Sequence, residues 1–322
     1  MDSESLVPGF YPRDKTTHVA FYLGIDGGGT KTSCLVGDER SVLGSGTGAG
    51  SNLVRVSEAQ ASDSLAAAVR QACSAAKVAP KQITRTCVGM AGAARPQTSE
   101  VVTRILRGLV TGRIDVVGDM SIAFEAAFGL GPGVIVIAGT GSIAYGRNSA
   151  GKTARAGGWG PAISDEGSGH WIGRSALAAA MRVHNEGNVL PLLQKIMQAW
   201  GLHTHDELVL AANASPAPNF SVLSPLVSAA AEAGETLAMA VLSQAGSELA
   251  ALAEVVIHRL FGAAAATPVA MAGGVFGNSA QVRRSFYNSL CSRYPGITVN
   301  PAVIEPVRGA LEMARRMATL PG

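Results

Sequence analysis

Cysteine is scarce in this chain of 322 residues, and its four cysteines do not form a metal-binding motif. They are far apart, with no CxxC pair and no histidine at ligand spacing, at Cys34, Cys73, Cys87 and Cys291. Neither a zinc site nor an iron–sulfur cluster is therefore expected. Unpaired thiols are typical of a reducing compartment, so we expect a cytoplasmic protein.

Aromatic residues and blocks of like charge are scarce as well. Phe, Trp and Tyr make up 5% of the chain, and its 26 basic and 23 acidic residues are scattered along it. Proteins that bind nucleic acids usually present a clustered basic surface, and those that bind single strands add aromatic side chains for stacking. We therefore expect no nucleic-acid partner, and small molecules as the ligands.

Long apolar runs are also missing. No window approaches the roughly 18 uninterrupted apolar residues that suggest a membrane span, so we expect no membrane partner. The first twenty residues carry charged side chains in place of the apolar segment of a signal peptide. With Pro8 and Pro12, residues 1–17 predict a flexible N-terminal tail.

Apolar residues, in contrast, make up 47% of the chain. The length favours two domains, because a single core seldom grows beyond ~250–300 residues. We place the first domain at 18–130. Its pattern predicts strands at 19–25, 33–36, 41–43, 83–90 and 113–117, and helices at 57–77, 99–109 and from Asp119 onward.

A strand–glycine turn–strand unit at 19–36 returns at 134–147. This internal repeat predicts two related α/β domains that face each other. We place the second domain, with a helical insertion, at 131–303, and expect the final helix, within 304–318, to pack back on the first domain. The elements expected after the repeat are helices at 165–184, 189–200, 204–212, 221–231, 234–261, 279–291 and 304–317, and strands at 268–271 and 297–300.

Three glycine-rich turns stand out. The first, 27–32, exposes backbone N–H groups that can cradle phosphate oxygens, and Thr30 and Lys31 add a hydroxyl and an ammonium group. It differs from a P-loop, because Thr30 stands where the last glycine belongs and because it joins two strands. The second, 139–142, has the equivalent place in the other domain, and the third, 273–278, precedes a helix whose N-terminus can receive a nucleotide. Each alone also fits a plain hairpin or close helix packing.

Six segments in order carry a resemblance to a known family: GIDGGGTKT (24–32), GSN (50–52), GDMSIAFEAA (118–127), AGTGSIAYG (138–146), GGWGPAISDEGSGHWIGR (157–174) and AGGVFGNS (272–279). The set resembles the sugar kinase/actin/Hsp70 ATPase superfamily and, within it, the N-acetylglucosamine kinase and BadF/BadG-type ATPase branch. The resemblance implies an α/β fold of two ribonuclease-H-like domains, as in actin-like ATPases, with an inter-domain cleft that closes over ATP and substrate.

The resemblance also implies roles for individual residues. Asp119 would be the catalytic base that accepts the proton of the sugar 6-hydroxyl, and Asp26 would lie near Mg²⁺, through water. The ATP phosphates would contact Gly28, Gly29, Thr30, Lys31, Thr140 and Gly141. The adenosine would contact Gly273, Gly274 and Asn278. The sugar would contact Asn52, Asp119, Thr140, Trp159, Gly160 and Asp165.

Ordinary structural roles remain open for several of these residues. Asp119 and Asp165 could each cap a helix, Asn278 could cap another with Ser279, and Trp159 could belong to the core. Lys31 could be a solvated surface lysine, and His203 and His205 are read as a solvated helix start and not as metal ligands.

The expected function is ATP-dependent phosphorylation of an amino sugar, first of all N-acetylglucosamine, by a homodimer that requires ATP and Mg²⁺. Glucosamine or N-acetylmuramic acid is an alternative substrate. An activator ATPase is disfavoured because no cysteine lies between Cys87 and Cys291, and a ROK-type glucokinase because its cysteine-rich zinc motif is absent. A sugar sensor without catalysis is the remaining alternative.

Overall fold

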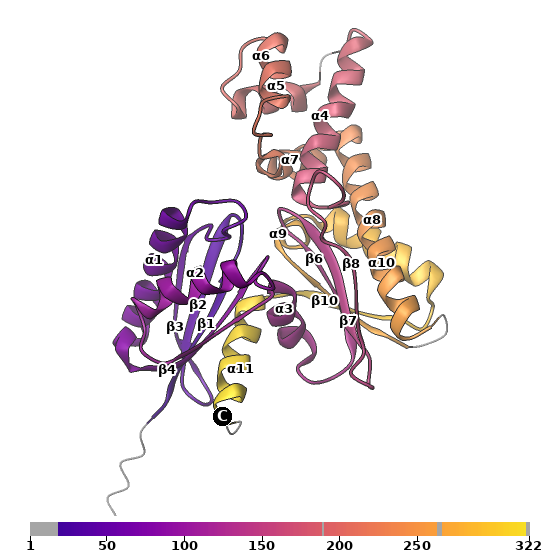
Figure 1. Ribbon diagram of the computed structural model, residues 1–322. Helices are drawn as coiled ribbons and strands as arrows, with labels where there is room; N and C mark the ends of the chain where they lie inside the picture. Colours follow the sequence, from indigo (N-terminus) through magenta and orange to yellow (C-terminus); the bar gives the residue numbers. More distant parts are fainter. Residues whose placement is uncertain (1–18, 189, 263–265, 320–322) are drawn as a thin grey trace, which may run out of the picture.

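The computed structural model describes residues 19–188, 190–262 and 266–319, without the side chain of residue 319. The predicted tail, 1–17, and the first residue of the predicted N-terminal domain lie outside the described residues. Two sheets stand side by side, helices α3 and α11 lie between them, and a helical arm rises above the C-terminal sheet (Figure 1).

The N-terminal sheet has five strands in the order β3-β2-β1-β4-β5. Strand β1 pairs antiparallel with β2 and parallel with β4, which in turn pairs parallel with β5. The strands are β1 (Phe21–Gly27), β2 (Lys31–Gly37), β3 (Val42–Ala49), β4 (Ile83–Met90) and β5 (Arg113–Val117). The third strand is longer than the three residues predicted, because the glycines at 44, 46 and 48 interrupt the apolar pattern from which strands are predicted. These glycines let helix α1 lie close on the sheet.

Both faces of this sheet are covered, as the alternation along β1 requires. Leu23 and Ile25 pack under α1 (Glu58–Ala76) and α2 (Pro96–Arg107), whereas Tyr22 packs on the opposite side against α11 (Pro306–Thr319). Helix α1 begins where the Ser57 hydroxyl accepts a hydrogen bond from the Gln60 N–H, and it buries the predicted face of Leu65, Ala68, Val69 and Ala72. Each fully buried Leu or Val contributes roughly 1.5–3 kcal/mol.

The C-terminal sheet repeats this arrangement in the order β10-β9-β6-β7-β8. A hairpin of antiparallel strands is again followed by parallel neighbours. The repeated order confirms the predicted pair of related α/β domains. The strands are β6 (Gly133–Ala138), β7 (Ser142–Arg147), β8 (Thr153–Gly157), β9 (Pro268–Ala272) and β10 (Thr298–Ile304). Strand β8 was not predicted.

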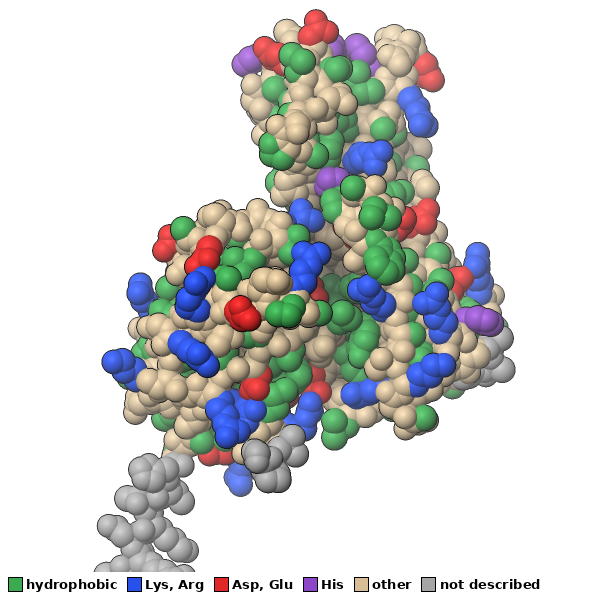
Figure 2. Space-filling model, in the orientation of Figure 1, with side chains coloured by type: hydrophobic (Ala, Val, Ile, Leu, Met, Phe, Trp, Pro, Cys, Tyr) green, Lys and Arg blue, Asp and Glu red, His purple; other side chains and the backbone are tan. Residues whose placement is uncertain are grey.

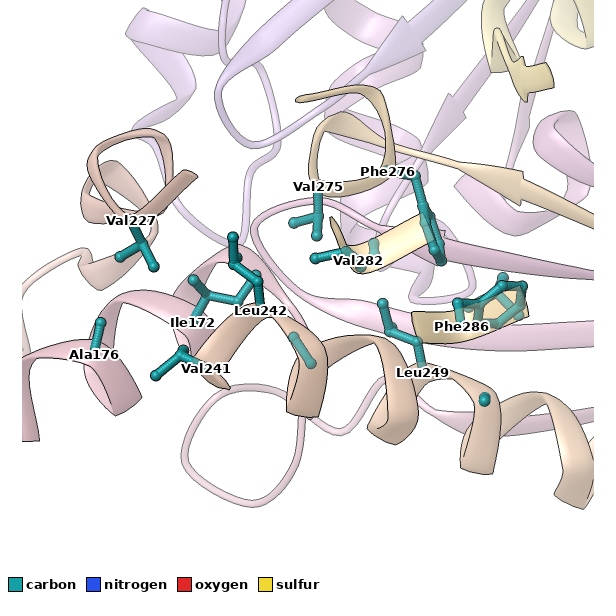
Figure 3. Close-up of a cluster of buried hydrophobic side chains, with 14 of the residues drawn as sticks. Ile172, Ala176, Val227, Val241, Leu242, Leu249, Val275, Phe276, Val282 and Phe286 are labelled. Carbon is teal, nitrogen blue, oxygen red and sulfur yellow. The ribbon is translucent and has the colours of Figure 1, made fainter. Parts of the chain in front are cut away.

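Helices of the main body and of the arm share the C-terminal core. Those of the main body are α4 (Gly169–Asn185), α7 (Ser224–Glu232), α8 (Thr236–Leu260), α9 (Gly274–Asn278) and α10 (Ala280–Arg293). Figure 3 shows Ile172 of α4 and Leu242 of α8 in one apolar cluster, with Phe276 and Phe286 in edge contact 5.1 Å apart at its other end. The arm adds α5 (Pro191–Ala199) and α6 (His205–Ala212), and a short 3-10 turn, Phe220–Leu223, precedes α7.

Helix α8 is long and apolar enough, by length and composition alone, to cross a membrane. Half of its most apolar window is nevertheless buried within the protein, and eleven of its residues, from Ala238 to Leu260, are buried along it. It packs on α10 and on strands of the C-terminal sheet. Its apolar length is therefore that of a core helix.

Helix α3 (Asp119–Phe128) belongs to both halves of the molecule. Its Ile122 lies in the cluster formed by β4 and α11, whereas Ala123 and Phe124 pack against Ile135 and Ala270 of the C-terminal sheet. The C-terminal end of α3 is held from the second domain as well, because the Arg147 guanidinium donates to the carbonyls of residues 129 and 131, at 2.7 and 3.1 Å. Any movement of the two sheets relative to each other must involve α3.

Candidate active site

The first glycine turn joins β1 to β2 through residues 28–30. The Gly28 N–H donates to the Lys31 carbonyl at 3.0 Å, and a Cβ on Gly28 would lie only 2.7 Å from that oxygen. The loop after β3 is tied to the same turn, because the N–H groups of Ser51 and Asn52 donate to the Gly28 carbonyl at 3.1 and 3.3 Å. The turn is therefore held from two sides, with Thr30 and Lys31 at its exposed tip.

The second turn joins β6 to β7 and faces the first across the two domains. The Gly139 N–H donates to the Gly141 carbonyl at 2.9 Å, which closes the turn. The hydroxyl oxygens of Thr30 and Thr140 lie 3.3 Å apart, at exposed positions 110 residues apart in the chain. The structure thus brings together the two turns that the sequence singled out.

The third turn lies beside the second. Strand β9 runs parallel to β6 and ends at Ala272, which is aligned with Ile137. Gly273 follows with φ at +97°, and a Cβ there would collide with the Ala138 carbonyl, so only glycine fits. Gly274 and Asn278 begin and end the short helix α9, which was not predicted. The cap of α10 is Ser279, whose hydroxyl accepts from the Val282 N–H at 3.3 Å.

Asp26 and Asp119 leave the N-terminal sheet at the same edge. Asp26 is aligned with Gly89 of the parallel strand β4, and Gly89 is aligned with Val117 of β5. Asp119 follows Val117 by two residues and therefore lies just beyond the same edge of the sheet. Burial, and then the nearby Asp119 carboxylate, raises the pKa of Asp26 to about 7, against a smaller opposing effect of Lys31. Two acidic side chains therefore share one poorly solvated position.

Asp119 is the first residue of α3, and Gly118 holds the capping position. Its carboxylate accepts a hydrogen bond from the Met120 N–H at 2.9 Å. Burial raises the pKa of Asp119, and this hydrogen bond partly opposes the change. The plain reading of Asp119 as the N-cap is therefore wrong, although the positive end of the helix dipole still favours a carboxylate in this first turn.

The loop from Gly157 to Ser168 contains several residues with left-handed backbone. Four of its glycines have φ between +72° and +89°, namely Gly157, Gly158, Gly160 and Gly167. Asp165 also has a positive φ of 72°, which is uncommon for a residue with a side chain. Backbone of this kind is often found at functional sites.

Asp165 is 4% exposed and lies against the second turn. Its carboxylate accepts from the Ser142 N–H at 3.3 Å, and a Cβ on Gly141 would lie 2.8 Å from one of its oxygens. Burial raises the pKa of Asp165, while the Ser142 N–H and the positive charge of Arg55 lower it. Asp165 does not cap α4: the helix begins four residues later than predicted, at Gly169, where the Ser168 hydroxyl accepts from the Trp171 N–H at 3.1 Å.

The other residues expected to bind the sugar lie on both sides of the turns. Trp159 is 59% exposed, with the Arg155 guanidinium 4.5 Å from its ring centroid, so it is not a core residue. The Gly160 carbonyl accepts from the N–H groups of Ile163 and Ser164 at 3.1 and 2.9 Å. Asn52 is buried, and its side-chain oxygen accepts from the Val54 N–H at 3.0 Å. Figure 2 shows a hollow in the molecular surface where the two domains and the helical arm meet.

Sequence reasoning missed two residues at this place. Arg55 lies beside Gly29, and His170 is the second residue of α4, where its N–H donates to the Thr140 carbonyl at 3.3 Å. His170 is 9% exposed, its ring packs edge-on against Phe220, and its Nδ1 has no hydrogen-bond partner. Its position within the segment 157–174 was the only signal, whereas no pattern in the sequence distinguished Arg55.

The acidic pair suits a divalent cation. Within the described ranges no three His, Cys, Asp or Glu side chains form a metal-binding group. Magnesium usually keeps several waters and uses one or two carboxylates together with substrate phosphates, so it does not need such a group. A cation near Asp26 would offset the repulsion that raises the pKa of this residue, and the donor set fits Mg²⁺.

Comparisons with known proteins find an ATPase family and relatives named as amino-sugar kinases. The BadF/BadG/BcrA/BcrD ATPase family matches residues 23–314. The chain is 29% identical over 301 residues to an N-acetylmuramic acid/N-acetylglucosamine kinase of Clostridium acetobutylicum, covering 92% of this chain and 98% of the relative. It is 27% identical over 309 residues to an N-acetyl-D-glucosamine kinase of Dictyostelium discoideum, covering 91% and 97%.

Solved structures share the fold at lower identity. A proposed N-acetylglucosamine kinase from Chromobacterium violaceum superposes with a TM-score of 0.73 at 24% identity, over 92% of this chain and 99% of that one. A ROK family glucokinase from Streptomyces griseus, solved with glucose and AMPPNP, gives 0.59 at 16% identity, over 92% and 100%. These likenesses establish the two-domain architecture of actin-like ATPases and sugar kinases.

Proposed function

Because the chain belongs to the BadF/BadG/BcrA/BcrD ATPase family, we propose that it transfers the terminal phosphoryl group of ATP to the 6-hydroxyl of an amino sugar. N-acetylglucosamine is the first candidate substrate. Two relatives named as amino-sugar kinases, each matched over more than nine-tenths of this chain, support the phosphotransferase activity and the class of acceptor. N-acetylmuramic acid is the second candidate, because the Clostridium relative is named for both sugars.

One observation carries the proposal: the hydroxyls of Thr30 and Thr140 lie 3.3 Å apart, so the two glycine turns meet. Backbone N–H groups of both turns and the Lys31 ammonium would surround the phosphates of ATP from the two domains. Gly28, Gly29, Thr30, Thr140 and Gly141 would line this phosphate site. Gly273, Gly274 and Asn278, next to the second turn, would hold the adenosine.

Asp119 is proposed as the base. The sugar oxygen forms a bond to the γ-phosphorus while the bond from that phosphorus to the leaving oxygen of ADP breaks, and Asp119 accepts the hydroxyl proton. A base works best when its pKa lies near the working pH. Burial moves the pKa of Asp119 in that direction from its usual acidic range. Asp26 would hold Mg²⁺ through water, and the bound cation neutralises phosphate charge.

The sugar would lie between the two domains, against the second turn. The Asp165 carboxylate has one oxygen committed to the Ser142 N–H and is suited to accept hydrogen bonds from ring hydroxyls. Trp159 offers an exposed flat surface for a pyranose. Gly160, Thr140 and Asn52 would complete the contacts. Closure of the domains would exclude water from the reacting phosphoryl group. The protein would act as a homodimer in the cytoplasm.

The test is a coupled assay of ADP release with Mg-ATP and a panel of N-acetylglucosamine, N-acetylmuramic acid, glucosamine and glucose. Release that depends on one amino sugar, with formation of its 6-phosphate seen by mass spectrometry, is the expected result. ATP hydrolysis without dependence on any sugar would instead favour an activator ATPase, and nucleotide and sugar binding without turnover would favour a sensor.

A further inference from the structure

Arg55 belongs to a loop that is fixed to the first glycine turn. The N–H groups of Ser51 and Asn52 donate to the Gly28 carbonyl, and the Thr32 hydroxyl donates to Ser51 Oγ at 2.7 Å in a buried position. The Arg55 N–H then donates to the Asn52 carbonyl at 2.8 Å. The backbone of Arg55 is therefore held in a fixed relation to the turn, although its side chain is exposed.

The Arg55 side chain extends over the tip of that turn, toward the other domain. A Cβ on Gly29 would lie 3.1 Å from Arg55 Cδ, 3.6 Å from Arg55 Nε and 3.5 Å from the Thr140 hydroxyl oxygen. Arg55 and Thr140 therefore approach Gly29 together, and the guanidinium stands where the two turns meet. This is also the place at which the sugar-facing Asp165 lies against Gly141.

The Arg55 guanidinium has no short-range polar partner in the described part of the chain. Among the residues that the structure describes, no carboxylate forms an ion pair with Arg55 and its guanidinium makes no hydrogen bond, whereas the arginines at 85, 104, 293, 308, 315 and 316 all have acidic partners. Its charge nevertheless acts across the domains, because it lowers the pKa of both Asp165 and His170. An unpaired guanidinium is thus directed at the reaction site.

We infer that Arg55 is a further catalytic residue, whose guanidinium binds the equatorial oxygens of the phosphoryl group as it passes from ATP to the sugar. This inference rests on the proposed function. A planar guanidinium can form two parallel hydrogen bonds to a phosphoryl group. Arg55 forms no covalent bond: the leaving ADP oxygen keeps the electron pair of the broken bond, the proton goes to Asp119, and Arg55 stabilises the charge in between.

The first test separates turnover from binding. Arg55→Ala should lower kcat with N-acetylglucosamine by about 10³-fold or more, while KM for the sugar changes by less than ~3-fold, the pattern of an interaction made only in the transition state. The kcat of Arg55→Lys should lie between those of the wild type and Arg55→Ala, because the lysine ammonium keeps the positive charge but cannot form two parallel hydrogen bonds as a guanidinium can. Arg70→Ala, at an exposed position on α1, is the matched control and should leave kcat unchanged.

Two results would overturn the inference. In one, Arg55→Ala keeps kcat within ~3-fold of the wild type. In the other, Arg55→Ala loses activity only with N-acetylmuramic acid and not with the uncharged N-acetylglucosamine, which would assign the guanidinium to the substrate carboxylate.

A second measurement does not depend on the sugar. ADP with aluminium fluoride mimics the planar phosphoryl group, and Arg55→Ala should weaken its binding by roughly 100-fold while the affinity for Mg-ADP changes little, by isothermal titration calorimetry. If the wild type releases ADP with no sugar of the panel, the proposed function fails, and this titration still tests Arg55. Equal affinities of the wild type and Arg55→Ala for the mimic, or a wild type that binds it no better than ADP, would contradict the inference.

Discussion

The two domains have the same strand order and differ in what they bring to the site. In the proposed function, the N-terminal domain would supply the groups whose charge matters to phosphoryl transfer, Asp26, Asp119 and Arg55, which lie within one turn or loop of its sheet. The C-terminal domain supplies the loop Gly157–Ser168, in which five residues have left-handed backbone, and a helical arm. On this proposal one domain would carry the reactive groups and the other would shape the sugar site, so substitutions in the two domains should have different kinetic effects.

The largest effect is expected for Asp119→Asn. An amide of the same shape cannot accept the hydroxyl proton, so kcat should fall by roughly 10²–10⁴-fold while the sugar still binds. Coupled ADP release measures kcat, and titration calorimetry measures sugar affinity. Asp115→Asn, four residues earlier in a salt bridge with Arg85, is the control and should keep most of the activity. Substantial turnover by Asp119→Asn would remove this residue as the base.

Asp165→Asn tests the other side of the comparison. Asn tolerates the left-handed backbone that Asp165 adopts, so the loop should keep its shape. A hydrogen bond to a charged group contributes about 1.5–3 kcal/mol, so KM for the sugar should rise by roughly 10–100-fold, and kcat should change less. The adjacent Glu166→Gln is the control. A variant that loses kcat and keeps KM would contradict the division between the domains.

The sequence predicted a helix or strand correctly where the residues of that element carried a clear pattern of their own. Strands β4 and β5 and the start of α3 were predicted to the residue, because apolar runs ended at clear glycine or acidic signals. Strand β8, TARAG, was missed because five small and polar residues carry no apolar alternation. The start of α4 was placed too early because a left-handed Asp165 cannot be distinguished from a helix cap by residue type.

The site residues that the sequence predicted are likewise those that belong to a local pattern. The glycine turns and the carboxylates after strands were found because each has a local pattern, and the fold brings Thr30 and Thr140 together. Arg55 was missed because its significance arises only when a loop of one domain faces the turn of the other. His170 was missed because an unpartnered, buried Nδ1 is a property of packing and not of sequence.

Two buried groups, one in each domain, should also make stability depend on pH in opposite directions. The pKa of Asp26 is raised to about 7 in the folded protein, so the folded state keeps a proton that the unfolded chain loses near pH 4. Stability is therefore lost as pH rises from about 4 to about 7. Asp26→Asn should remove this loss and raise the melting temperature at pH 8 by at least ~2 °C, in buffer with EDTA, while lowering activity.

The comparison with wild type at pH 5 is the internal control for Asp26→Asn, because the gain should be smaller where Asp26 is largely protonated in the folded state. A gain of equal size at both pH values would mean that the substitution acts through packing and not through the charge.

His170, in the C-terminal domain, should act in the opposite direction and with a smaller effect. Burial, followed by the positive charges of Arg55 and Arg174, lowers the pKa of His170. The unfolded chain binds a proton near pH 6.5 that the folded state resists, so stability is lost as pH falls below that value, by at most about 1.4 kcal/mol per pH unit. His170→Phe can keep the edge contact with Phe220 and removes the unpartnered nitrogen, so its melting temperature should fall less than that of the wild type between pH 7 and pH 5.5. The exposed His258→Gln should leave this slope unchanged, and a His170→Phe slope equal to that of the wild type would show that His170 is protonated as easily in the folded chain as in the unfolded one.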